Sequence, residues 1–119
     1  YTPRGKFIGN DPFDRWVKPS CMLVCEDNYS NAHGTPWLYK EMGIGKLIGA
    51  PVPGTMTAVW WENIGQYTFG IPQVGTRDNR DNYLENQQLN PDIECYVTPE
   101  NMLRGIDTQI ETAVKETMK

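Results

Sequence analysis

The sequence predicts an α/β domain whose sheet contains both parallel and antiparallel strands. In the first half of the chain, short apolar runs alternate with helix-compatible segments, an order typical of parallel sheets. Two strand-like runs then follow each other closely, at 57–62 and 66–71, which favours a hairpin. The chain has 119 residues, enough for one domain with a hydrophobic core.

The beginning of the chain is predicted to connect rather than to form a folded layer. Residues 1–20 are rich in proline, glycine and charged residues and show no hydrophobic period. We therefore expect a connecting segment here and a folded domain over 21–119. The large apolar residues of the segment are expected to anchor it, namely Phe7, Ile8, Phe13 and Trp16.

A strand and a helix are predicted next. The run CMLVCE at 21–26 lacks alternation, which is typical of a strand covered on both faces. A helix from about 31 to 42 follows and ends at Gly43, a residue that favours the C-terminal end of helices. Pro36 inside this segment predicts a kink or a later start, near Thr35.

The second half contains more strand-like segments. KLIG at 46–49 is predicted to be a short strand, and TAVWWE at 57–62 pairs with QYTFGI at 66–71. Trp60 and Trp61 are adjacent, so they point to opposite faces, and one of them is expected in the core. Residues 72–82 are polar and predicted to be a loop, and 92–97 form a further strand.

Two helices are predicted at the C-terminal end. Thr98 is expected to cap a short helix beginning at Pro99, because proline suits the first helical position. A last helix is predicted to start at Asp107. Its apolar residues fall on one face, which should pack on the domain: Ile106, Ile110, Ala113 and Val114.

Composition excludes several classes of function. The formal net charge is −4 and no basic cluster occurs, which argues against a nucleic-acid partner. No apolar run is long enough for a membrane span. The glycines at 43–49 do not have the spacing of a dinucleotide fingerprint. The cysteine and aspartate spacings match no zinc or calcium motif, so we expect no metal and no cofactor.

Ser30 is a candidate nucleophile. It lies between the strand at 21–26 and the following helix, after the polar turn at 27–29. A hydroxyl at such a junction sits beside helix N-terminal amides, whose partial positive charge suits a developing oxyanion. Serine also favours helix N-caps for purely structural reasons, so position alone leaves both interpretations open.

Several blocks of the sequence, in the right order, closely resemble the S41 serine peptidases, and the tricorn-like branch in particular. The resemblance covers nearly all of 20–119, including the closing stretch from Pro99 to Val114. The blocks are Glu26–Gly34, Gly43–Pro51, Pro53–Thr55, Gly70–Gly75 and Tyr83–Ile93, the last of which is similar to the "LEN…PDI" signature of the family.

The resemblance implies a fold, an activity and a set of residues. The fold would be a ClpP/crotonase-like mixed β-sheet with flanking helices, of which this chain is the C-terminal portion. The activity would be that of a serine endopeptidase working through an acyl-enzyme. Ser30 would attack, the backbone N–H of Asn31 would supply an oxyanion-hole donor, and Glu85 would support the catalytic base. The tricorn-like pattern commonly has Asp where Asn31 stands, which puts any contact of that carboxylate in doubt.

The general base is missing from this pattern. The processing proteases of the family use a lysine where this chain has Thr55. The tricorn-like branch uses a histidine contributed from well before the nucleophile. His33 is the one histidine, and an imidazole three residues after Ser30 would point along the helix. We therefore expect the base in sequence upstream of Tyr1. For His33 we expect a structural or substrate-lining role, and for Thr55 a substrate-lining one.

Partners and alternatives follow from the same resemblance. We expect a peptide or protein substrate, an association with the upstream part of the same polypeptide and a possible homo-oligomer, in a periplasmic or secreted bacterial protein. The alternative is a non-catalytic S41-like module that binds peptide, or carbohydrate through exposed tryptophan and tyrosine, without turnover.

Overall fold

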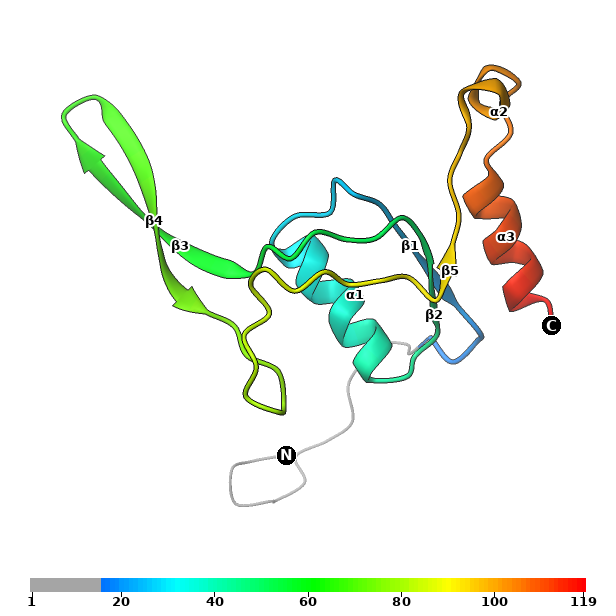
Figure 1. Cartoon of the computed structure of the whole chain (residues 1–119), viewed down its shortest axis with the longest axis horizontal. Helices are drawn as coiled ribbons and strands as arrows, with labels where there is room; N and C mark the ends of the chain where they lie inside the picture. The colour runs from blue at the N-terminus through cyan, green and yellow to red at the C-terminus, as the bar shows by residue number, and fades with distance from the viewer. Residues whose placement is uncertain (1–15) are drawn as a thin grey trace.

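The computed structural model describes residues 16–119, which form a small α/β body and a projecting hairpin (Figure 1). Three of the expected anchors, Phe7, Ile8 and Phe13, lie outside the described residues. The fourth, Trp16, is 72% exposed. Trp16 therefore does not anchor the chain against the described part of the domain, contrary to the expectation from its apolar ring.

A parallel three-stranded sheet forms the centre of the body. Its order is β1 (Cys21–Val24), β2 (Lys46–Gly49) and β5 (Ile93–Glu94), with Leu23 of β1 opposite Ile48 of β2. Both outer strands are shorter than the sequence predicts. The core lies around β2 and is made of Val24, Tyr39, Leu47 and Val52.

Helix α1 (Asn31–Glu41) packs on β1 and β2. Gly43 follows it with a φ of 62°, which confirms the predicted C-terminal glycine. The prediction of a later helix start near Thr35 is wrong, because α1 begins at Asn31 and contains Pro36. Proline lacks the N–H that would bond the carbonyl of Ala32, and the side chain of Asn28 donates to that carbonyl instead, at 2.7 Å.

The hairpin consists of β3 (Thr57–Ile64) and β4 (Tyr67–Gly75), joined through Gly65 and paired in an antiparallel ladder. We call it the arm, because it projects from the body (Figure 1). The predicted loop at 72–82 is wrong over 72–75, which extend β4. Trp60 and Trp61 are 58% and 69% exposed, so neither is in the described core.

Two helices close the described chain, α2 (Pro99–Leu103) and α3 (Thr108–Thr117). Thr98 caps α2 as predicted, with its hydroxyl accepting from the N–H of Asn101. Asp107 caps α3, accepting from the N–H groups of Gln109 and Ile110, both at 3.0 Å.

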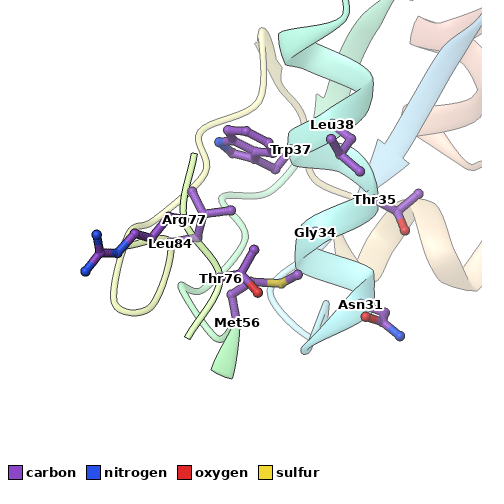
Figure 2. A pocket seen from close by; sticks show the side chains of 9 residues that line it. All are labelled: Asn31, Gly34, Thr35, Trp37, Leu38, Met56, Thr76, Arg77 and Leu84. Atoms are coloured by element: carbon purple, nitrogen blue, oxygen red, sulfur yellow. The ribbon is translucent and has the colours of Figure 1, made fainter. Parts of the chain in front are cut away.

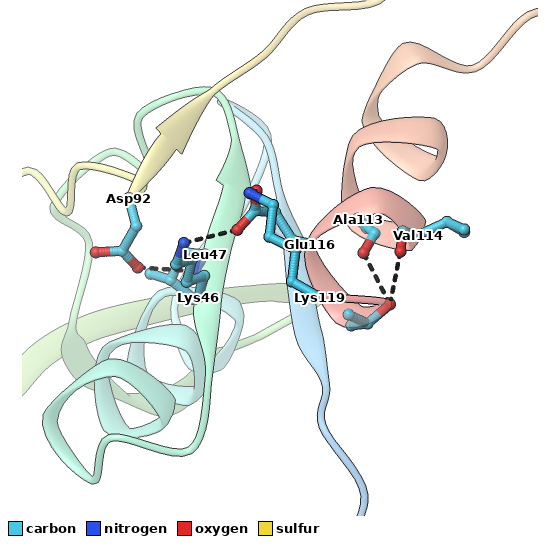
Figure 3. A network of polar contacts seen from close by, with 8 residues as sticks. Lys46, Leu47, Asp92, Ala113, Val114, Glu116 and Lys119 are labelled. Carbon is cyan, nitrogen blue, oxygen red and sulfur yellow. Dashed lines mark hydrogen bonds and ion pairs between the residues drawn. The ribbon is translucent and has the colours of Figure 1, made fainter.

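The face of α3 that packs on the sheet differs from the predicted apolar face. Of the four residues predicted on that face, Ile106 and Ala113 are half-buried, whereas Ile110 and Val114 are 51% and 54% exposed. The contacts come from the neighbouring face, where Gln109 donates to the carbonyl of Cys95 at 2.9 Å. Glu116 of that face forms an ion pair with Lys46 at 2.6 Å (Figure 3). Polar contacts to β2 and to the segment after β5 therefore orient the helix.

The predicted α/β class is confirmed. The parallel and antiparallel strands fall into two separate sheets within residues 16–119. No helix in this part of the chain has the length and apolar character needed to cross a membrane.

Candidate active site

Ser30 lies at the junction of β1 and α1 in a backbone conformation that a residue with a Cβ rarely adopts. Its φ is 55° and its ψ is −116°. Its carbonyl accepts from the N–H groups of His33, at 2.8 Å, and Gly34, at 3.1 Å. Its side chain makes no capping hydrogen bond. The hydroxyl is therefore not used in the way that the structural interpretation of an N-cap serine requires.

Asn28 holds this turn in place, a role that the sequence analysis missed. Its Oδ1 accepts from the N–H of Cys25 at 3.1 Å, and its amide donates to the carbonyl of Ala32 at 2.7 Å. The side chain thus ties the end of β1 to the first turn of α1. An asparagine two residues before the candidate nucleophile, in a tight turn, was the available signal, since asparagine side chains commonly bond nearby backbone groups.

Ser30 opens into a cleft of about 390 Å³ between the start of α1 and the base of the arm. Consecutive residues of β3, from Thr57 to Val59, line its other side together with Trp61. Asn31 also lines the cleft, and its N–H has no acceptor among the described residues. The cleft therefore combines a free hydroxyl with an available backbone donor next to it.

Glu85 is fixed by the residues around it. Leu84 before it is buried, and Asn86 after it has a φ of 60°, a left-handed conformation that asparagine tolerates. The Glu85 Oε2 accepts from the N–H of Met56 at 2.7 Å and from the hydroxyl of Thr57 at 2.8 Å. These donors hold the pKa of Glu85 below its ordinary value. Thr57 thus contacts Glu85 and also lines the cleft that contains Ser30.

His33 and Thr55 lie apart from the cleft lining. The side chain of His33 is fully buried, and neither ring nitrogen has a hydrogen-bond partner among the described residues. Burial lowers its pKa, an effect that the charge of Glu85 only partly offsets. An imidazole enclosed in this way does not line the Ser30 cleft.

A second, smaller cavity of about 230 Å³ lies along the exposed side of α1. Asn31, Gly34, Thr35 and Leu38 form one wall, and Met56 lies against Gly34, where a Cβ would come within 2.5 Å of its Cε (Figure 2). Asn31 borders both cavities. Across residues 16–119, no group of three or more His, Cys, Asp or Glu side chains is arranged to hold a metal ion.

Comparison with known proteins identifies both a family and a fold. The model of peptidase family S41 matches residues 2–95. No curated protein sequence matches the chain. Similar solved structures include the tricorn protease, at 23% identity and a TM-score of 0.75 over 94% of this chain. A candidate peptidase from Parabacteroides merdae is 18% identical, with a TM-score of 0.73 over 92% of this chain.

Mature CPAF is a further similar structure, at 21% identity and a TM-score of 0.68 over 76% of this chain. These likenesses establish the fold. The chain spans 12%, 35% and 18% of the tricorn protease, the Parabacteroides merdae protein and CPAF respectively.

Proposed function

Because this chain belongs to peptidase family S41, we propose that it carries the nucleophile of a serine endopeptidase that works through an acyl-enzyme. One observation carries the proposal. Ser30, whose hydroxyl makes no capping hydrogen bond, lines a cleft together with Asn31, whose N–H has no acceptor among the described residues. A nucleophile next to a fixed donor is the arrangement that acyl transfer needs.

In the proposed reaction, the Ser30 Oγ attacks the scissile carbonyl as a general base takes its proton. The N–H of Asn31 donates to the oxyanion. The base then protonates the leaving amine, and water hydrolyses the ester on Ser30. Since the Asn31 donor is main chain, asparagine in place of aspartate leaves it intact. Glu85 would support the base through hydrogen bonds.

The base itself is proposed to come from sequence outside the described residues. The burial of His33 supports this, because an imidazole without contact to the cleft cannot take the proton of Ser30. We therefore expect no peptidase turnover from the isolated 119-residue chain. Robust cleavage by the isolated chain that is lost in His33→Ala would contradict this assignment.

The proposed substrate is an extended segment of peptide or protein. In the described residues, β3 pairs with β4 on one edge only. Consecutive residues from both faces of β3 line the cleft, which indicates that its free edge borders Ser30. A peptide that binds along a free strand edge gains main-chain hydrogen bonds. Bound in this way, its scissile carbonyl would lie close to the hydroxyl of Ser30.

The test is covalent labelling of the full-length polypeptide by an active-site-directed phosphonate. We expect one adduct, on Ser30, and none in Ser30→Ala. Asn28→Ala should fold but label slowly, since the turn loses the two hydrogen bonds of the Asn28 side chain.

The alternative, a peptide- or carbohydrate-binding module without turnover, is favoured by the exposed Trp60 and Trp61. Ligand binding by a folded protein that is not labelled would support that alternative.

A further inference from the structure

The carboxylate of Glu85 is held through only one of its two oxygens. Oε2 accepts both the N–H of Met56, at 2.7 Å, and the hydroxyl of Thr57, at 2.8 Å. Among the described residues, Oε1 makes no hydrogen bond. Two adjacent residues at the start of β3 therefore fix the position of the group and leave one oxygen available.

The side chain of Thr57 connects this carboxylate to the cleft. Thr57 begins β3 and pairs with Gly75 of β4, so the ladder of the arm fixes its backbone. The same residue lines the cleft that holds Ser30. Its hydroxyl is thus a donor on a rigid strand, aimed at an ionised group that lies 28 residues further along the chain.

We propose that Thr57 is a positioning residue, whose hydroxyl, with the N–H of Met56, holds Oε2 of Glu85 in place and leaves Oε1 to support the general base. The inference rests on the proposed function, because it gives Glu85 a role in supporting that base. Thr57 acts through Glu85 and touches neither the attacking oxygen nor the scissile bond.

A hydrogen bond to an ionised carboxylate stabilises the charged form. Removing the Thr57 hydroxyl leaves Oε2 with the N–H of Met56 as its remaining donor among the described residues. The carboxylate is then held less firmly, and so is its free oxygen. We therefore expect an effect on kcat, which depends on the support of the base, and none on KM.

The experiment compares variants of the full-length polypeptide on a fluorogenic peptide. In Thr57→Val we expect kcat at neutral pH to fall about tenfold with KM unchanged. Thr57→Ser keeps the hydroxyl and should restore kcat. Thr57→Ala serves as a second deletion of the hydroxyl if the valine variant does not fold.

Thr68→Val is the matched control, because Thr68 lies on the same arm and donates to the side chain of Asn63 at 2.6 Å. It should leave kcat and KM unchanged. An unchanged kcat in Thr57→Val, or no rescue by Thr57→Ser, in an enzyme that Ser30→Ala inactivates would overturn this inference alone. Activity that survives Ser30→Ala would overturn the proposed function, and the inference with it.

Discussion

The backbone is strained at Ser30, the residue that we propose as the nucleophile. A positive φ in this region suits glycine and costs other residues of order 1–3 kcal/mol. The carbonyl of Ser30 nevertheless starts helix α1, through bonds to the N–H groups of His33 and Gly34. A glycine would fill the same place without strain, so the side chain at this position brings no conformational gain.

We predict that Ser30→Gly is more stable than the unmodified chain, by about 1 kcal/mol in the free energy of unfolding. Relief of strain exceeds the larger entropy that glycine loses on folding. Ser30→Ala removes the same hydroxyl but keeps a Cβ, so its stability should stay near that of the unmodified chain. Urea denaturation of the three proteins measures the difference. A glycine variant less stable than the alanine variant would contradict the strained conformation.

The buried imidazole of His33 predicts a pH-dependent stability. Its pKa in the folded protein lies below its ordinary value of about 6.5. The unfolded chain therefore binds a proton more readily, and stability falls as the pH decreases below about 6.5. The slope for one such group is at most about 1.4 kcal/mol per pH unit. The carboxylates with lowered pKa, including Glu85, lose their contribution only at lower pH.

Urea denaturation between pH 5 and pH 7 measures this effect. The unmodified chain should lose stability toward pH 5, and His33→Leu should show a flatter profile over the same range. The variant also removes two buried nitrogens that have no partner among the described residues. Its free energy of unfolding at pH 7 should therefore stay close to that of the unmodified chain. Identical pH profiles for the two proteins would contradict a neutral, buried His33.

At the scale of elements, Asp92 joins three of them. Its Oδ2 accepts from the N–H of Leu47 in β2 at 2.8 Å, and its Oδ1 pairs with Lys40 of α1 at 2.9 Å (Figure 3 shows the first contact). Asp92 itself directly precedes β5. Burial raises the pKa of Asp92, but these two partners outweigh it and the pKa is lowered. The aspartate of the PDI block therefore holds β2, α1 and the start of β5 together.

We predict that Asp92→Ala lowers the free energy of unfolding by about 2 kcal/mol, since it leaves the N–H of the buried Leu47 without an acceptor. Asp81→Ala is the control. Asp81 pairs with Arg77 at 2.7 Å on the surface, and an exposed pair of this kind contributes less than about 1 kcal/mol. Thermal or urea denaturation of the two variants measures the difference in their free energies of unfolding. Equal effects of the two substitutions would show that Asp92 is only another surface ion pair.

At the scale of the whole molecule, the arm and α3 both carry exposed apolar faces. In the arm, opposite residues share a face, so Trp60 lies beside Ile71, and Ile64 beside Tyr67. All four are exposed. On α3, Ile110, Val114 and Met118 form an exposed stripe at helical spacing. A two-stranded ribbon is marginally stable by itself, and exposed apolar faces of this kind favour association.

We therefore expect the isolated chain to self-associate, and the apolar face of the arm to contribute. Analytical ultracentrifugation of Trp60→Ser combined with Ile71→Ser should show a shift toward monomer. Trp61→Ser is the control, since Trp61 lies on the opposite face and packs over Gly70. A compact monomer at high concentration, for the unmodified chain, would contradict this prediction.

Local signals in the sequence were sufficient for the α/β class, the order of the elements and the residues at which most of them begin. Gly43, Thr98 and Asp107 end or start helices through bonds within a few residues, and such local chemistry is legible in a sequence. The strand–turn–helix around Ser30 is local as well. The blocks containing Ser30, Asn31 and Glu85 indicated the family and named the candidate site.

Tertiary structure decided the contacts between distant segments. The packing face of α3 follows its polar partners on β2 and beyond β5 rather than its apolar residues, and β4 continues to Gly75 because β3 offers a partner along its length. The bond from Thr57 to Glu85 joins residues 28 apart, and that from Leu47 to Asp92 joins residues 45 apart. Such contacts depend on how the elements pack together, which no local pattern of residues specifies.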